Sequence, residues 1–206
     1  MPLFSIITPA WNRVESLPKL IASLKSQTFK DFEWVLGNDG SNDGTKEFIE
    51  SIKDTLDFNL TFINFSLRGG KAKLDNELLN HAKGKFLIWC DSDDYLKDDA
   101  LEYFSNIIAN IKEDNEFDAI LAQNLDTYGI SQTFHDQNKQ FDDEVLTWED
   151  FYETLKGDGT ICINSKCFMN MRFLEVDFLI TESSLLQKVF KNKRFFVSKK
   201  VVKIMD

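Results

Sequence analysis

The sequence of 206 residues predicts an α/β fold, with a mostly parallel central sheet, helices on both faces and a decorated C-terminal third. Short apolar segments recur through residues 1–122, and the one over Lys85–Cys90 shows no alternation, as expected for a strand buried on both faces. Each is followed by a polar turn and then by apolar residues at helical spacing. Repeated strand and helix units of this length are typical of a doubly wound sheet. Because no internal repeat or low-complexity linker interrupts them, we expect a single domain over residues 1–206.

Five strands and four helices are expected in the first half of the chain. The strands are predicted over Phe4–Pro9, Phe32–Gly37, Leu60–Phe65, Lys85–Cys90 and Phe117–Ala122. The helices are expected to begin near Ser16, near Asp43 or Thr45, after Lys71 and near Asp98. The third helix is expected to stop at Gly84, which we interpret as its C-terminal cap.

The C-terminal third shows a less regular pattern. Residues 123–143 are predicted to form a long polar loop or an irregular flap. The elements expected beyond it are a short helix over Leu146–Leu155, a strand over Thr160–Asn164, a helix over Glu182–Phe190 and an extended Phe195–Val202.

Composition and charge limit the partners of the chain. A formal net charge of −10 argues against a nucleic-acid backbone and against tight attachment to an anionic membrane surface. The first residues lack a charged leader, and no apolar segment is long enough to span a bilayer. We therefore expect no transmembrane segment and a cytoplasmic protein, with peripheral contact at the inner face of the membrane left open. The three cysteines lack metal-type spacing and are expected to be reduced thiols.

Three carboxylates, Asp91, Asp93 and Asp94, follow directly after the buried strand that ends at Cys90. In open α/β sheets, ligands bind at the carboxyl ends of the strands. Three acidic groups at such an end would repel one another unless a cation neutralised them, and oxygen ligands suit Mg²⁺ or Mn²⁺. Such an ion usually completes its shell with substrate phosphates. The alternative is a polar turn that caps the helix near Asp98, because turns of this composition are common.

Four polar segments that follow strands are expected to meet at one edge of the sheet. They are residues 8–13, 38–40, 69–71 and 91–94. Asp39 is suited to hydrogen-bond a base or a ribose, and Gly69-Gly70-Lys71 is suited to approach a phosphate with backbone donors and one ammonium group. Each signal is weak by itself, but together they describe a pocket for a nucleotide diphosphate and a metal ion.

At these segments the sequence resembles the family 2 glycosyltransferases, enzymes of the Rossmann-like GT-A fold that use nucleotide-activated sugars. The matching segments are residues 4–13, 26–29, 32–45, 69–71, 82–84 and 91–94, in the order and at the spacing of the family. They cover the first half of the chain, and the second half resembles the family only loosely. The resemblance implies a nucleotide-sugar-binding half, residues 1–122, and an acceptor-side half, residues 123–206.

The resemblance also implies roles for individual residues. The nucleotide-sugar site is expected to contain Thr8, Pro9, Asn12, Asp39, Lys71 and Asp91. Within it, Asp39 matches the residue that contacts the base, and Asp91 matches the carboxylate near the ribose. Asp93, with Asp91 and Asp94 beside it, is expected to hold the Mn²⁺ or Mg²⁺ that bridges the diphosphate. Glu182 matches the general base that takes the proton of the acceptor hydroxyl.

Four positions depart from the pattern of the family. Asn38 stands where relatives usually have an aspartate, and Ala72 replaces an expected histidine. Asp75 stands where many relatives carry arginine or an apolar residue, and Ser183 replaces the aspartate that usually follows the position of Glu182. These departures concern sugar contacts and base activation, whereas the nucleotide and metal elements are retained.

The predicted function is the inverting transfer of a sugar from a UDP-sugar to a hydroxyl of a glycan or lipid-linked acceptor, in surface polysaccharide or glycolipid assembly. The alternative is a catalytically impaired subunit that binds a nucleotide sugar and acts through a partner, which the departures keep open. A nucleotidyltransferase would normally carry a glycine-rich loop near the first strand, and residues 8–13 contain no glycine. From the sequence, Glu182 is also explained as a glutamate favoured by the dipole at a helix N-terminus.

Overall fold

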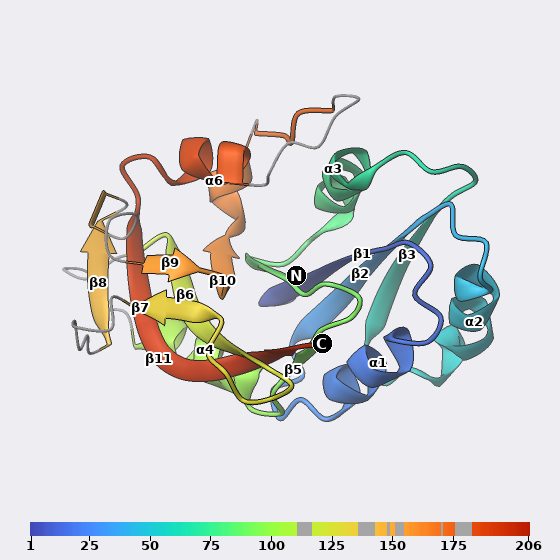
Figure 1. Cartoon of the computed structure of the whole chain (residues 1–206), viewed down its shortest axis with the longest axis horizontal. Helices are drawn as coiled ribbons and strands as arrows, with labels where there is room; N and C mark the ends of the chain where they lie inside the picture. Colours follow the sequence, from blue (N-terminus) through green and yellow to red (C-terminus); the bar gives the residue numbers. More distant parts are fainter. Residues whose placement is uncertain (111–116, 136–142, 148, 151–154, 170, 176–182) are drawn as a thin grey trace.

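The computed structural model describes residues 1–110, 117–135, 143–147, 149–150, 155–169, 171–175 and 183–206. Its strands are β1 (Phe4–Ala10), β2 (Phe32–Asp39), β3 (Asn59–Phe65), β4 (Phe86–Trp89), β5 (Tyr95–Leu96), β6 (Ala119–Asp126), β7 (Thr133–His135), β8 (Glu144–Thr147), β9 (Leu155–Gly157), β10 (Gly159–Asn164) and β11 (Arg194–Met205). In the described residues, one long curved sheet has the order β3-β2-β1-β4-β10-β6-β11-β5, with β8 paired to β11 (Figure 1). β7 and β9 form a separate antiparallel pair. The predicted α/β fold is confirmed.

The first half of the sheet is parallel, as the sequence predicts. β2 pairs with β3 and β1, and β1 pairs with β4, all in parallel. Every residue of β1 and β2 is buried, which explains their continuous apolar pattern. The carboxyl ends of these strands therefore lie at one edge of the sheet.

The second half of the sheet is mixed. β10 runs antiparallel to both β4 and β6, and β11 runs parallel to β6 but antiparallel to β5 and β8. The chain passes beyond β4 to form β6 and then returns as β10, which lies between these two strands and runs antiparallel to both. Both halves of the sequence thus contribute to one sheet, and the predicted division into a nucleotide half and an acceptor half stays a prediction.

Helices cover both faces of the sheet (Figure 1). They are α1 (Leu17–Lys25), α2 (Thr45–Ile52), α3 (Lys71–His81), α4 (Ala100–Ala109) and α6 (Ser183–Phe190), with short 3₁₀ turns η1 (Lys53–Thr55) and η3 (Ser165–Phe168). Among the described residues, no helix is long and apolar enough to cross a membrane.

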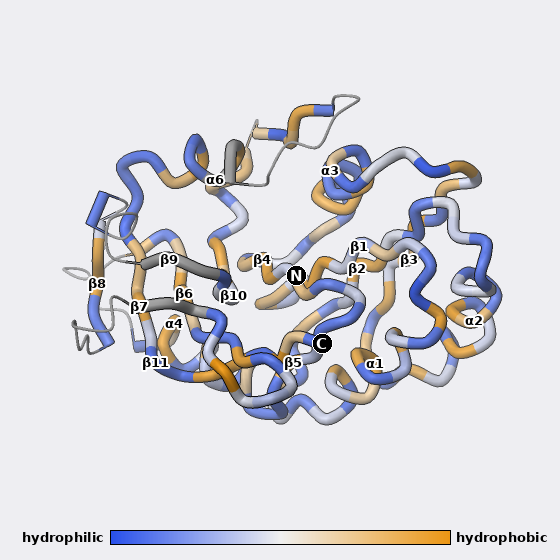
Figure 2. Tube along the Cα trace, in the orientation of Figure 1, coloured by the Kyte–Doolittle hydropathy of each residue, from blue (hydrophilic) through white to orange (hydrophobic). Residues whose placement is uncertain are grey.

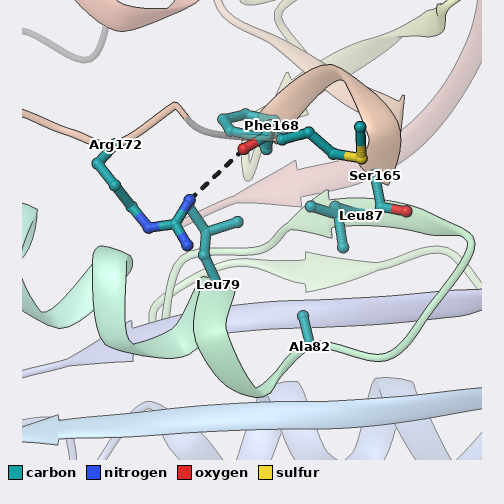
Figure 3. Close-up of a pocket in the computed structure, with 7 residues that line it drawn as sticks. Leu79, Ala82, Leu87, Ser165, Phe168 and Arg172 are labelled. Carbon is teal, nitrogen blue, oxygen red and sulfur yellow. Dashed lines mark hydrogen bonds between the residues drawn. The ribbon is translucent and has the colours of Figure 1, made fainter.

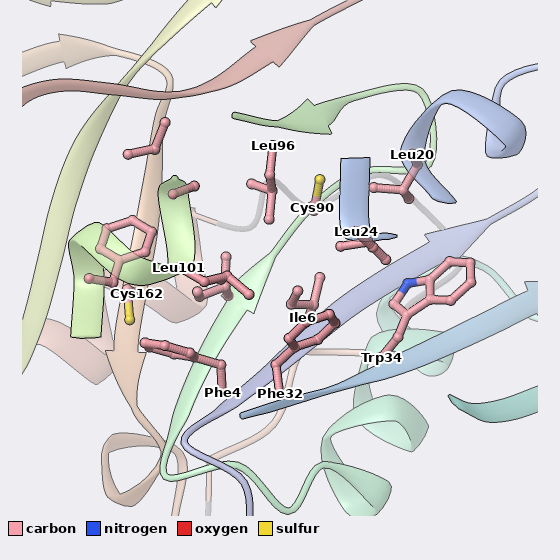
Figure 4. Close-up of a cluster of buried hydrophobic side chains, with 14 of the residues drawn as sticks. Phe4, Ile6, Leu20, Leu24, Phe32, Trp34, Cys90, Leu96, Leu101 and Cys162 are labelled. Atoms are coloured by element: carbon pink, nitrogen blue, oxygen red, sulfur yellow. The ribbon is translucent and has the colours of Figure 1, made fainter. Parts of the chain in front are cut away.

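Two hydrophobic clusters hold the layers together. The first joins α1, α2 and α4 to one face of the sheet around Phe4, Ile6 and Trp34 (Figure 4). The second joins α3 and α6 to the other face around Ile7 and Val35. Complete burial of one such side chain contributes about 1.5–3 kcal/mol. Neighbouring residues of one strand thus stabilise opposite layers, and the tube in Figure 2 shows apolar residues along the strands and polar residues along the loops.

Gly84 differs from its predicted role. α3 ends at His81, and the amide of Ala82 closes its last turn by donating to the carbonyl of Leu78. A Cβ atom at Gly84 would lie 2.3 Å from the backbone nitrogen of Ser5, and the Gly84 amide donates to Ser5 Oγ at 2.7 Å. Glycine is therefore required here because two backbone segments approach closely, not because a helix ends.

The C-terminal third contains more strand than its sequence predicts. β6 continues to Asp126 and β7 follows, so the predicted loop over residues 123–143 is wrong for these parts. Leu146 lies in β8 instead of a helix, and residues 151–154 lie outside the described residues. β6 and β8 both pair with β11, and such pairing across the sequence leaves no local pattern. The predicted strand at 160–164, the described part of the helix at 183–190 and the extended segment at 195–202 are confirmed.

Candidate active site

A cavity of about 340 Å³ lies at the carboxyl ends of the parallel strands. Residues 9–11 and Arg13 line it from the end of β1 and the loop that follows, and Asp39 lines it from the end of β2. Arg68 and Lys71 line it from the segment after β3, and residues 91–93 line it from the turn after β4. All four segments that the sequence predicts to meet therefore contribute to one cavity, as the parallel topology requires.

The loop after β1 is fastened to the turn after β2. Three consecutive amides of the loop donate to side chains of the turn: Asn12 N to Ser41 Oγ at 2.8 Å, Arg13 N to Thr45 Oγ1 at 2.9 Å and Val14 N to Asp43 Oδ2 at 3.1 Å. The Asn12 side chain returns the contact, because its Oδ1 accepts from the amide of Asn42 at 3.0 Å. Asn12, predicted in the nucleotide site, thus joins the two loops that form the cavity. In the sequence, Asp43 and Thr45 stand out only as the start of a helix, and nothing there indicates that they and Ser41 bind the loop after β1.

Asp39 connects the end of β2 to the loop before α3. Its Oδ1 accepts from the Gly69 amide at 2.6 Å, and its Oδ2 accepts from the Gly70 amide at 3.0 Å. The loop also approaches Gly40, which has φ +65° and where a Cβ atom would lie 2.5 Å from the Arg68 nitrogen. The two glycine amides therefore donate to Asp39 and not to a phosphate, the partner predicted from the sequence.

Thr8 and Pro9 lie on different sides of β1. The Thr8 side chain is fully buried, and its Oγ1 accepts a hydrogen bond from Trp34 Nε1 at 3.0 Å. Trp34 belongs to the first hydrophobic cluster, so Thr8 packs beneath the site, whereas Pro9 lines the cavity. The next aromatic residue, Trp11, lies at the cavity with 41% of its surface exposed, and the Arg68 guanidinium lies 3.5 Å from the centre of its ring.

Basic side chains accompany two of the three predicted metal carboxylates. Arg13 Nη2 lies 3.1 Å from Asp93 Oδ2, and Lys71 Nζ lies 3.7 Å from Asp91 Oδ1. Lys71 also lies 3.3 Å from Oδ2 of Asp75, whose side chain is 1% exposed. The cavity thus presents acidic and basic groups together, an arrangement suited to a ligand that carries phosphates and a cation.

Asp94 is buried, whereas Asp91 and Asp93 line the cavity. Its carboxylate lies 2.6 Å from the ammonium group of Lys203, and both residues are buried. Burial raises the pKa of the Asp94 carboxyl group, and the Lys203 ammonium opposes that rise. Among the described residues, no cluster of three or more His, Cys, Asp or Glu side chains is arranged to hold a metal ion.

A comparison with protein families agrees with this geometry. The family described as "Glycosyl transferase family 2" matches residues 5–176, well over half of the chain. The chain belongs to glycosyl transferase family 2. The resemblance seen in the sequence is thereby confirmed.

Two curated relatives of this family 2 protein are bacterial glycosyltransferases. A GalNAc(5)-diNAcBac-PP-undecaprenol beta-1,3-glucosyltransferase of Campylobacter jejuni is 27% identical over 207 residues, covering 97% of this chain and 63% of the relative. The poly(ribitol-phosphate) beta-N-acetylglucosaminyltransferase TarS of Staphylococcus aureus is 33% identical over 104 residues, covering 50% of this chain and 18% of TarS. The chain therefore spans less than two thirds of the length of either relative.

Solved structures share the fold. A structure of S. aureus TarS 1–349 has a TM-score of 0.81 and 25% identity, covering 98% of this chain and 60% of that one. The same fragment in complex with UDP-GlcNAc has a TM-score of 0.77 and 24% identity, with 98% and 57% covered. The mannosyltransferase PcManGT from Pyrobaculum calidifontis, in complex with GDP-Man and Mn²⁺, has a TM-score of 0.70 and 18% identity, with 98% and 56% covered.

Two of the residues that depart from the family pattern, Asn38 and Asp75, form hydrogen bonds with neighbouring side chains. Asn38 donates from Nδ2 to Asn64 Oδ1 at 2.7 Å, and its Oδ1 accepts from Ser41 Oγ. Asp75 also accepts from Trp89 Nε1 at 3.3 Å, beneath Lys71. The predicted base Glu182 lies outside the described residues, and α6 begins at the next residue.

A second cavity of about 350 Å³ lies elsewhere on the family 2 fold (Figure 3). Leu79 and Leu87 line it from α3 and the beginning of β4, and Phe168 lines it from η3. Arg172 borders it and donates to the Phe168 carbonyl at 3.5 Å. Because it lies beside the beginning of β4, it is separate from the carboxylates that follow the end of this strand.

Proposed function

We propose that this family 2 protein transfers a sugar from a nucleotide sugar, probed first as a UDP-sugar, to an acceptor hydroxyl with inversion at the anomeric carbon. The observation that carries the proposal is the cavity at the ends of β1 to β4, where Asp39, Lys71, Asp91 and Asp93 converge. Family membership gives the reaction class, and the cavity gives the donor a place to bind.

The proposed donor pose follows from the charges of the cavity. The base lies toward Asp39 and Trp11, and the diphosphate lies toward the basic side chains of Arg13, Arg68 and Lys71. As the sugar leaves, these cations stabilise the negative charge that develops on the diphosphate. The UDP class is supported by TarS, which is related in sequence and was solved with UDP-GlcNAc.

Asp91 and Asp93 fit a Mn²⁺ or Mg²⁺ ion bound together with the donor. Mg²⁺ sites often have one or two carboxylates and take further oxygens from substrate phosphates, so two carboxylates are sufficient. When bound, such an ion neutralises part of the diphosphate charge. The fold neighbour PcManGT was solved with GDP-Man and Mn²⁺. We assign Asp94 to positioning instead of metal binding, because Lys203 already neutralises it.

Glu182 is the proposed general base. In the transfer, the acceptor oxygen bonds to the anomeric carbon and loses its proton to Glu182, while the bond from that carbon to the diphosphate oxygen breaks and UDP leaves. The sequence supports this role, since Glu182 stands at the position that the general base occupies in the family pattern. The same reasoning leaves the helix-dipole explanation of this residue for the experiment to exclude.

The proposed setting is the assembly of a surface polysaccharide or glycolipid at the cytoplasmic face of the membrane, with a glycan or lipid-linked acceptor. The name of the C. jejuni relative includes an undecaprenol-linked acceptor, and TarS is named for poly(ribitol-phosphate). Both names support an envelope glycan as the class of acceptor.

The test is release of nucleotide from UDP-, GDP- and dTDP-sugars, with and without Mn²⁺, in the wild type and in Asp93→Ala and Glu182→Gln. We expect metal-stimulated release of UDP that Asp93→Ala abolishes, and Glu182→Gln to lose turnover while still binding UDP. Asp57→Ala is the matched control, because Asp57 pairs with Lys30 away from the cavity.

Two other outcomes would contradict the proposal. UDP binding with metal but without turnover of any donor would favour the impaired subunit that acts through a partner. Absence of both binding and turnover would exclude a donor site in this cavity.

A further inference from the structure

The buried ion pair between Asp94 and Lys203 joins the donor cavity to the last strand of the described chain. Asp94 is 5% exposed and Lys203 is 4% exposed, and their charged atoms lie 2.6 Å apart. By contrast, the side chains of Asp91 and Asp93 are 50% and 39% exposed at the cavity. The turn therefore has one carboxylate anchored inside the protein and two at the surface of the site.

The backbone around this turn is fastened to the same strand. The Asp94 amide donates to the Asp91 carbonyl at 3.0 Å, which closes the turn. Directly afterwards, β5 pairs with β11 through Leu96 and Lys203, and the Lys97 amide donates to the Val202 carbonyl at 2.8 Å. Side-chain and backbone contacts thus hold the turn from one side.

We propose that Lys203 is a positioning residue of the donor site: by holding Asp94 beneath the turn, it aims the carboxylates of Asp91 and Asp93 into the cavity. The proposal rests on the proposed function, since it takes Asp91 and Asp93 as the groups that meet the metal and the donor. Lys203 itself touches neither.

The surroundings of Lys203 favour this role. Among the described residues, the titratable groups near it include Cys90, Asp94 and Asp158, and of these three Asp94 belongs to the turn that carries Asp91 and Asp93. A buried ion pair is often no more stabilising than apolar residues of similar volume, so stability by itself gives little reason for its presence. Replacing a group that orients metal ligands without binding the metal itself typically changes metal affinity by about 10- to 100-fold.

The test compares Lys203→Met, the double variant Asp94→Asn/Lys203→Met and Lys200→Met with the wild type. The double variant is needed because Lys203→Met leaves Asp94 buried without a counter-ion, which destabilises the fold. Lys200→Met is the matched control: it removes an ion pair of the same strand with Asp99, away from the cavity. Each protein is measured for its unfolding midpoint, for UDP binding by calorimetry across a Mn²⁺ titration, and for donor KM.

We expect the double variant to recover the unfolding midpoint lost in Lys203→Met. The Mn²⁺ concentration that it needs for UDP binding should stay about 10- to 100-fold higher than in the wild type, because the side-chain anchor of the turn is still missing. Lys200→Met should change this requirement by less than about twofold, the range of an ordinary surface substitution.

Metal-dependent UDP binding in the double variant equal to that of the wild type would overturn the proposal, since Lys203 would then serve stability alone. The proposed function fails in a different way. If the wild type binds no UDP at any Mn²⁺ concentration, there is no donor site for Lys203 to position, and both proposals are excluded together.

Discussion

The guanidinium of Arg13 lies 3.1 Å from the carboxylate of Asp93, the residue that we propose as a metal ligand. The two side chains are 40% and 39% exposed, so water screens the pair. Ion pairs at such exposure contribute only about 0.2–1 kcal/mol. A divalent ion can displace a partner of this strength, and Arg13 therefore orients Asp93 without blocking it.

Replacing Arg13 by methionine should strengthen Mn²⁺ binding to the nucleotide-free protein, because Asp93 loses a competing cation. The affinity for Mn²⁺ should rise by up to about fivefold, which corresponds to the upper value of about 1 kcal/mol for an exposed ion pair. Calorimetric titration with Mn²⁺ measures it. Lys30→Met, which removes the exposed pair with Asp57, should leave the affinity unchanged. Weaker binding in Arg13→Met would show that Arg13 supports the metal site instead of competing with it.

Asp39→Asn should destabilise the loop before α3 and weaken donor binding. The carboxylate accepts from the amides of Gly69 and Gly70, and an asparagine would turn an NH₂ group toward one of these donors. We expect the free energy of unfolding to fall by about 1.5–3 kcal/mol, as for loss of a hydrogen bond to a charged group. Urea unfolding and donor KM measure the two effects. Asp57→Asn is the control, and equal results for both variants would contradict the loop-holding role of Asp39.

Gly40→Ala and Gly44→Ala should separate backbone strain from crowding. Both glycines have positive φ, but only at Gly40 would a Cβ atom meet the loop, 2.5 Å from the Arg68 nitrogen, whereas nothing lies within 4 Å at Gly44. Each variant carries a strain of about 1–2 kcal/mol. Gly40→Ala should lose further stability and also raise donor KM, because Arg68 lines the cavity. The same unfolding midpoint and KM in both variants would contradict the close contact.

The meeting of four segments at one cavity could be predicted from the sequence, because the carboxyl ends of parallel strands share an edge whatever their side chains do. The direction of each side chain could not. Thr8 and Asn12 lie in the matching segments, yet one packs beneath the site and the other ties two loops together. Their contacts are to residues distant in the sequence, and such contacts leave no periodic signal.

For the same reason, neither the ion pair of Asp94 nor the position of β10 could be predicted from the sequence. In the sequence, Asp94 is one of three neighbouring carboxylates, and its partner Lys203 lies just beyond the extended segment predicted over Phe195–Val202. The insertion of β10 between β4 and β6 likewise depends on pairing between distant strands. Burial of an apolar strand can be seen in its composition, but its neighbour and direction are decided by the whole sheet.

Asp43 gives a prediction for acid stability. Burial acts to raise the pKa of its carboxyl group, but hydrogen bonds from the Thr45 side chain and from the amides of Val14 and Thr45 outweigh this effect, and the pKa lies below its ordinary value of 3.8. A carboxyl group whose pKa is lowered by folding contributes stability above the pKa of the unfolded chain, and loses it as the pH falls through the folded value. The connection between the loop after β1 and the turn after β2 should therefore weaken below about pH 4.

Unfolding of the wild type and of Asp43→Asn across the acid range measures this contribution. The difference in unfolding free energy between them should be constant above about pH 5 and should shrink below it, because protonated aspartic acid and asparagine are then equally uncharged. Asp57→Asn provides a control for the Val14 contact. The pKa of Asp57 is also lowered, chiefly by the Lys30 side chain, but Asp57 lies away from these two loops. Donor KM should rise together with the loss of stability in Asp43→Asn and not in Asp57→Asn. A difference between wild type and Asp43→Asn that does not change with pH would mean that the Asp43 charge does not fasten the two loops.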